Sequence, residues 1–131
     1  MQHLDFQERS TRIKSEIQDS NPDLICLQEV DHLKDVYEPF LIEMGYVFHT
    51  EWRRIDNDAI LIGYKKDSFE KLETNGFQHN QMTKKYGGGD LFRKDNAGLL
   101  VKLRHKITNK EFIIANTHLN WRPYLDFVKY A

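Results

Sequence analysis

The feature that most constrains the fold is the stretch DLICLQEV at residues 23–30, an apolar run that ends in an amide and a carboxylate. Polar, turn-forming residues lie on both sides of it. A short apolar run between such residues is typical of a strand buried on both faces in an α/β protein. The single cysteine, Cys26, lies inside the run, so we expect a small core side chain there and neither a disulfide nor a cysteine metal site.

Glu29 stands at the end of this predicted strand. An ionised carboxylate removed from water needs a cation, a metal or several hydrogen-bond donors. In open α/β sheets, ligands bind beyond the carboxyl ends of the strands. Glu29 is therefore a candidate site residue, and the alternative is a surface glutamate in the loop that follows the strand.

The composition limits the class of protein. A chain of 131 residues with 40% hydrophobic and 30% charged residues is typical of a single soluble globular domain. The net charge of −1 provides no overall attraction to nucleic acid or to an anionic membrane, so any phosphate binding has to come from a local site. No stretch has the length of a membrane span, and the N-terminus has no apolar signal core. We expect an intracellular protein without a membrane partner, in the cytoplasm, with the nucleus or a mitochondrion as alternatives.

The first half of the chain alternates helices and strands. The pattern predicts a helix over residues 5–19, with Asp5 and Glu8 at capping-box spacing and a stop at the Asn21-Pro22 pair. Apolar residues recur at helical spacing over residues 33–44, and Pro39 predicts a kink or break in that helix. A strand then follows at residues 46–49, which completes a crossover unit and predicts a layered α/β fold.

The second half consists mainly of strands. A buried strand at residues 59–64 is followed, after a short turn, by an expected antiparallel partner at residues 69–76. Residues 96–103 and 111–119 form a predicted hairpin. A helix is expected to begin near Tyr124. The resulting prediction is an α/β architecture with a mixed, largely antiparallel sheet.

The strand at residues 111–119 also ends in polar side chains. Asn116 and His118 are two residues apart and therefore share one face of a strand. A carboxylate, an imidazole, an amide and an arginine suit phosphate-ester hydrolysis assisted by Mg²⁺, which prefers oxygen ligands. In this hypothesis Glu29 binds the metal, His118 donates to the phosphate oxygens, Asn116 orients the histidine or a water, and Arg53 or Arg54 contacts a second phosphate. The alternatives are a core histidine at His118 and solvated surface arginines.

Four segments of the chain resemble motifs of the endonuclease/exonuclease/phosphatase superfamily, in the branch of the deadenylases, nocturnin and the angel proteins. Residues 12–30 resemble its RI…NPDIICLQEV signature, and residues 58–64 resemble a strand that opens with Asp-Gly, with Ala59 at the usual glycine. Residues 96–100 look like its NVAL strand, and residues 116–129 resemble its NTHLxWxP…DxVK motif.

The resemblance implies a four-layered α/β sandwich and a Mg²⁺-dependent, or Mn²⁺-dependent, phosphodiesterase, usually a 3′-to-5′ exoribonuclease acting on poly(A). By position, Glu29 matches the metal-binding glutamate and His118 the histidine at the scissile phosphate. Pro123 matches a proline that packs against the substrate base. Arg53 lies near a loop that supplies a basic phosphate contact.

The chain also departs from the family pattern. It has no counterpart of the family's first strand, and the motifs DxN and SDH that follow in the family are missing, so residues 1–131 are expected to form an incomplete domain. One hypothesis is the N-terminal part of a phosphodiesterase acting on RNA or another phosphodiester. The other is an inactive, truncated or split relative that serves as a binding or assembly subunit, with a partner chain or self-association covering its exposed sheet.

Overall fold

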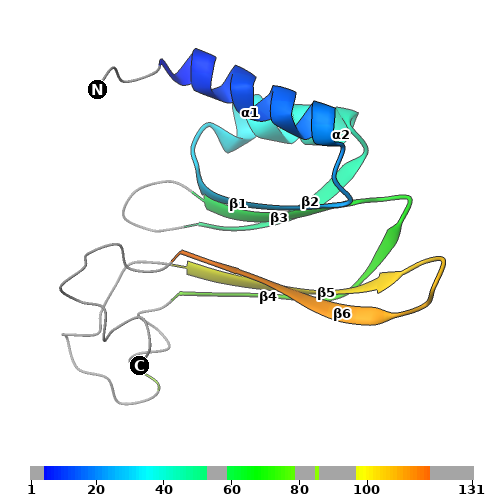
Figure 1. Ribbon diagram of the computed structural model, residues 1–131. Helices are drawn as coiled ribbons and strands as arrows, with labels where there is room; N and C mark the ends of the chain where they lie inside the picture. Colours follow the sequence, from blue (N-terminus) through cyan, green and yellow to red (C-terminus); the bar gives the residue numbers. More distant parts are fainter. Residues whose placement is uncertain (1–4, 53–58, 79–84, 86–96, 119–131) are drawn as a thin grey trace.

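The computed structural model describes residues 5–52, 59–78, 85 and 97–118 (Figure 1). The elements are, in order, α1 (Phe6–Ser20), β1 (Leu24–Val30), a π-helical turn η1 (Leu33–Tyr37), α2 (Glu38–Glu43), β2 (Tyr46–Trp52), β3 (Ala59–Lys65), β4 (Phe69–Gln78), β5 (Ala97–His105) and β6 (Glu111–Thr117).

The strands form two three-stranded sheets with the orders β1-β3-β2 and β4-β5-β6. The helices α1 and α2 cover one face of the first sheet, and the second sheet lies against its other face (Figure 1). The predicted α/β sandwich is thus confirmed, and the described residues form a helical layer and two sheet layers. Every pairing among the described strands is antiparallel. The crossover through α2 joins β1 to β2, which run parallel to each other on either side of β3.

The central strand of the first sheet is β3, and β1 lies at an edge of it among the described strands. The side chains of Ile60, Leu61 and Ile62 are almost completely buried because β3 has a neighbour on both edges and a packed layer on both faces. The prediction that residues 23–30 form a strand buried on both faces is therefore wrong. Cys26, expected in the core, is exposed because no described strand covers the outer edge of β1.

The predicted pairing of β3 with β4 is also wrong, because these strands belong to different sheets. Both edges of β3 are already occupied by β1 and β2, so the turn after Lys65 carries the chain to the second sheet. There β4 pairs with β5. The predicted hairpin is confirmed as β5 and β6, and Asn109 in its turn adopts a φ of 61°.

The helix ends agree with the sequence except at one cap. Asp5 is the N-cap of α1, but its side chain makes no capping hydrogen bond, so the predicted capping box is wrong. Asn21 ends α1 in the left-handed conformation, and its N–H donates to the carbonyl of Ile17 at 2.9 Å. The predicted break near Pro39 is confirmed, since a π-helical turn ends at Tyr37 and Pro39 lies in the first turn of α2, where its missing N–H costs little.

Two apolar clusters hold the layers together. One joins the helices to the first sheet and includes Ile17, Leu41 and Leu61, while the other fills the space between the sheets and includes Ile62, Leu99 and Val101. None of the described helices is long and apolar enough to cross a membrane. The helix predicted near Tyr124 lies outside the described residues.

Candidate active site

A bulge in β1 shapes the site. The β1–β3 register moves from Leu27 opposite Leu61 to Val30 opposite Ala59, so β1 uses one more residue than its partner. Within this irregularity Glu29 adopts a φ of 53°, a left-handed conformation that is unfavourable for a residue with a Cβ atom. Bulges of this kind are common beside active sites because they re-aim a side chain.

The bulge brings Glu29 to His118, 89 positions further along the chain. Nε2 of His118 lies 2.9 Å from Oε1 of Glu29, which joins the end of β1 in one sheet to the residue after β6 in the other. The His118 side chain is only 12% exposed, whereas that of Glu29 is 63% exposed. The carboxylate is therefore open to a ligand, while the imidazole is held by the protein.

The second ring nitrogen of His118 is in an unusual position. Nδ1 is buried and has no hydrogen-bond partner among the described residues. When Nε2 carries the proton and donates to Glu29, Nδ1 of the neutral ring is an acceptor. A buried acceptor without a donor is costly and is rare in protein structures.

Asn116 connects the two sheets. Its Nδ2 donates to the carbonyls of Leu27 in β1 and Leu61 in β3, at 2.9 Å in each case, and the residue is 5% exposed. Its Oδ1 accepts a hydrogen bond from Gln28 at 3.2 Å. The side chain of Asn116 thus bonds to backbone carbonyls of the opposite sheet and to Gln28. Asn116 can therefore influence the orientation of His118 only indirectly, by holding β6 in place.

Gln28 is a site residue that sequence reasoning missed. Its Nε2 donates to the carbonyl of Thr117 at 2.6 Å as well as to Asn116. Together these bonds hold the bulge of β1 against the end of β6. One signal for Gln28 was present in the sequence. It directly precedes Glu29 at the end of an apolar strand, where an amide side chain needs a hydrogen-bond partner from another element.

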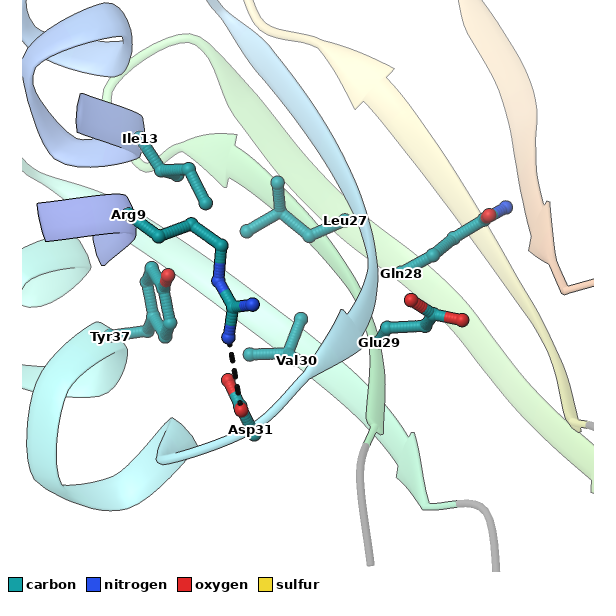
Figure 2. Close-up of a pocket in the computed structure, with 8 residues that line it drawn as sticks. All are labelled: Arg9, Ile13, Leu27, Gln28, Glu29, Val30, Asp31 and Tyr37. Atoms are coloured by element: carbon teal, nitrogen blue, oxygen red, sulfur yellow. Dashed lines mark hydrogen bonds and ion pairs between the residues drawn. The ribbon is translucent and has the colours of Figure 1, made fainter. Parts of the chain in front are cut away.

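A cavity of about 410 Å³ adjoins the site, between α1 and β1 (Figure 2). Arg9 reaches across it from α1 and forms an exposed ion pair with Asp31 at 3.4 Å. Burial raises the pKa of the Tyr37 hydroxyl, and the nearby Asp31 carboxylate raises it further. The cavity is lined by Arg9, Ile13, Leu27, Gln28, Glu29, Val30, Asp31 and Tyr37.

The described residues fit a metal with few protein ligands. No three histidine, cysteine, aspartate or glutamate side chains among them gather closely enough to hold a metal ion. Mg²⁺ often uses one or two carboxylates and completes its shell with water and substrate phosphate, and the exposed Glu29 meets that requirement. The other predicted site residues, Arg53 and Pro123, lie outside the described residues.

The chain is similar in sequence to known nucleases and their relatives, although no protein-family model matches it. It is 29% identical over 149 residues to the CCR4-Not complex 3′-5′-exoribonuclease subunit Ccr4 of Yarrowia lipolytica, which covers 96% of this chain and 21% of that protein. It is 30% identical over 136 residues to protein angel homolog 2 of Danio rerio, covering 98% of this chain and 23% of that protein. The chain thus spans about a fifth of the length of these two relatives.

The fold is similar to that of solved relatives. The human nocturnin catalytic domain with bound sulfate has a TM-score of 0.79 and 26% identity, over 93% of this chain and 46% of that one. ANGEL2, described as a 2′,3′-cyclic phosphatase and solved with adenosine-2′,3′-vanadate, has a TM-score of 0.82 and 27% identity, over 96% of this chain and 37% of that one. Since sequence motifs, sequence relatives and fold agree, the chain belongs to the endonuclease/exonuclease/phosphatase superfamily, among its deadenylase-like members.

Proposed function

We propose that this chain provides one part of the active site of a Mg²⁺-dependent phosphodiesterase that removes nucleotides from the 3′ end of RNA. The observation that supports it most directly is the 2.9 Å contact between Glu29 and His118. It combines an open carboxylate with a buried imidazole at the meeting point of two sheets.

Each residue would have a distinct role. Glu29 would hold Mg²⁺, with Mn²⁺ as a substitute, and the ion would polarise the phosphoryl oxygen and stabilise developing negative charge. His118, whose Nε2 contacts Glu29 in this structure, would turn that donor to the phosphate oxygens when Glu29 holds the metal. Asn116 would keep β6, and with it His118, at a fixed distance from β1. Arg53 would contact a second phosphate and Pro123 would pack against a base. Both roles are supported by the resemblance to the family sequence and not by contacts in the structure.

The substrate class follows from the relatives. Ccr4 is named as a 3′-5′-exoribonuclease subunit in several yeasts, and ANGEL2 is described as a 2′,3′-cyclic phosphatase. We favour an RNA 3′ end, with poly(A) as the first substrate to test and a terminal 2′,3′-cyclic phosphate as the second.

A second candidate is a binding or assembly subunit without catalysis. The observation that favours it is that the buried Nδ1 of His118 has no hydrogen-bond partner among the residues that the structure describes, so none of them fixes the tautomer of the imidazole from that side. In that case the partner would be a separate chain or a second copy.

The two candidates are separated with the full-length product of the gene that encodes these residues. We expect Mg²⁺-dependent shortening of a 5′-labelled oligoadenylate, and a loss of rate of about 100-fold or more in Glu29→Gln and His118→Gln. Glu43→Gln, an exposed position on α2, is the matched control and should leave the rate unchanged. Absence of Mg²⁺-dependent cleavage of the oligoadenylate and of a cyclic phosphate by the folded product would refute the enzyme and favour the subunit.

A further inference from the structure

Gln28 and Glu29 are neighbours in β1, yet both side chains reach the same end of β6. In a regular strand, successive side chains point to opposite faces of the sheet. Gln28 donates to the carbonyl of Thr117 at 2.6 Å and to Asn116 at 3.2 Å. Glu29 contacts His118 at 2.9 Å. The bulge of β1 therefore turns an amide and a carboxylate toward the same side, at the candidate active site.

The hydrogen-bond network fixes the direction of the Gln28 amide. Nδ2 of Asn116 donates to two backbone carbonyls of the first sheet, so Oδ1 of Asn116 faces Gln28. The other partner, the carbonyl of Thr117, can only accept a hydrogen bond. Both partners therefore need an N–H donor, and they use the two hydrogens of Nε2. The amide oxygen Oε1 of Gln28 consequently points away from both acceptors.

This amide oxygen remains available as an acceptor. Among the residues that the structure describes, none donates a hydrogen bond to Oε1 of Gln28. Gln28 is exposed and lines the same cavity as Glu29 (Figure 2). Mg²⁺ held by one or two carboxylates keeps several waters, and each of these waters has hydrogens to donate. An oriented amide oxygen beside the candidate ligand Glu29 suits such a water.

We infer that Gln28 is a positioning residue for the metal at Glu29, and that its amide oxygen accepts a hydrogen bond from a water of the metal shell. The two hydrogen bonds of Nε2 hold the amide in the orientation that presents this oxygen. Residues that act on a metal in this indirect way commonly change its affinity by about 10–100-fold when they are mutated. The inference rests on the proposed function, because it requires that Glu29 holds the metal.

Gln78 provides a matched control. It lies in β4, at the edge of the second sheet opposite to β6. Its Nε2 also makes two hydrogen bonds to the first sheet, to Glu51 at 2.8 Å and to the carbonyl of Trp52 at 2.9 Å. Gln78 is not among the residues that line the cavity beside Glu29. Loss of the Gln78 amide should therefore remove the same kind of bond between the sheets without an effect on the metal.

The experiment measures Mn²⁺ binding to the full-length product of the gene by isothermal titration calorimetry, so its readout does not depend on activity. The site of interest is the one that Glu29→Gln removes. We expect Gln28→Met, which keeps the length of the side chain but has no amide, to weaken this site about tenfold or more. Gln28→Asn, whose amide is one methylene shorter, is a second variant with the same expectation. Gln78→Met should leave the affinity unchanged.

Gln28→Glu separates the acceptor from the bonds between the sheets. It loses both Nε2 donors but keeps an oxygen acceptor and adds a negative charge, so it should bind Mn²⁺ at least as tightly as the parent protein. Urea unfolding of the same variants is the second readout. Gln28→Met and Gln78→Met should both lower the free energy of unfolding, whereas only Gln28→Met should weaken Mn²⁺ binding.

Two results would overturn the inference alone. One is parent-like Mn²⁺ affinity in Gln28→Met or Gln28→Asn, while Glu29→Gln abolishes the site. The other is equal weakening in Gln28→Met and Gln28→Glu, which would show that the amide only joins the sheets. If Glu29→Gln leaves Mn²⁺ binding unchanged, the metal is not held at Glu29, and the proposed function fails together with the inference.

Discussion

The side-chain amide of Asn116 on β6 donates to the backbone carbonyl of Leu61 on β3, at 2.9 Å and in a buried position. This bond crosses from one sheet to the other and ends on the central strand. It fixes the separation of the sheets beside the candidate active site.

Replacement of Asn116 by Ala should therefore destabilise the chain. The substitution removes the donors for the carbonyls of Leu27 and Leu61 and the acceptor for Gln28. Because an unsatisfied buried group costs about 1–3 kcal/mol, we expect the free energy of unfolding to fall by roughly 2–4 kcal/mol. Urea unfolding measures the change. Asn75→Ala, at an exposed position on β4, is the control and should stay within about 0.5 kcal/mol of the parent chain.

The left-handed conformation of Glu29 predicts an inverted preference between alanine and glycine. Both variants lose the carboxylate, but a φ of 53° penalises Ala by about 1 kcal/mol relative to Gly. Glu29→Gly should therefore be more stable than Glu29→Ala. At Thr74, an exposed position of β4, the usual order should hold, with Gly less stable than Ala. Equal stability of the Glu29 variants in thermal unfolding would contradict the bulge geometry.

Gly98 accommodates the ring of Phe77 on the neighbouring strand. A Cβ atom at Gly98 would collide with the ring, so Gly98→Ala should destabilise the chain by about 1–3 kcal/mol. Replacing Phe77 by Leu in the same chain should recover part of that loss. The control is Gly63→Ala in β3, where the nearest atom would lie at an ordinary 3.6 Å, and where a much smaller change is expected.

The half-buried His49 predicts a dependence of stability on pH. Burial lowers the pKa of His49, and the charge of Lys71 lowers it further. The folded state therefore binds a proton less readily than the unfolded state, whose histidine pKa is about 6.5, so stability should be constant above that pH and fall as the pH is lowered below it. His49→Gln should flatten this slope, and Lys71→Ala should reduce it, in urea unfolding between pH 7 and pH 5. An unchanged slope in His49→Gln would show that other groups cause it.

The hydrogen bond between His49 and Tyr64 offers a check on the same prediction. The ring nitrogen Nε2 lies 3.1 Å from the Tyr64 hydroxyl, which holds the imidazole between the layers. In Tyr64→Phe the ring loses this partner but stays buried, so the loss of stability on acidification should persist.

The sequence by itself indicated the candidate site residues and much of the local structure. The apolar runs around Leu61 and Ile114, the stop at Asn21 and the turn at Asn109 follow from short-range rules, and the motifs pointed to Glu29 and His118. Such signals depend on side-chain type and on residues close together in the chain, and both can be read directly from the sequence.

Only the tertiary structure decided which strand is central and how the site is held. An apolar run does not specify how many strands flank it, so the sequence could not show that β3 occupies the centre and leaves Cys26 on an edge. Nor could it show the bulge at Glu29 or the capture of Asn116 by carbonyls of the other sheet. These features arise from contacts between residues almost 90 positions apart, as between Glu29 and His118, and such contacts form only when the two sheets are stacked.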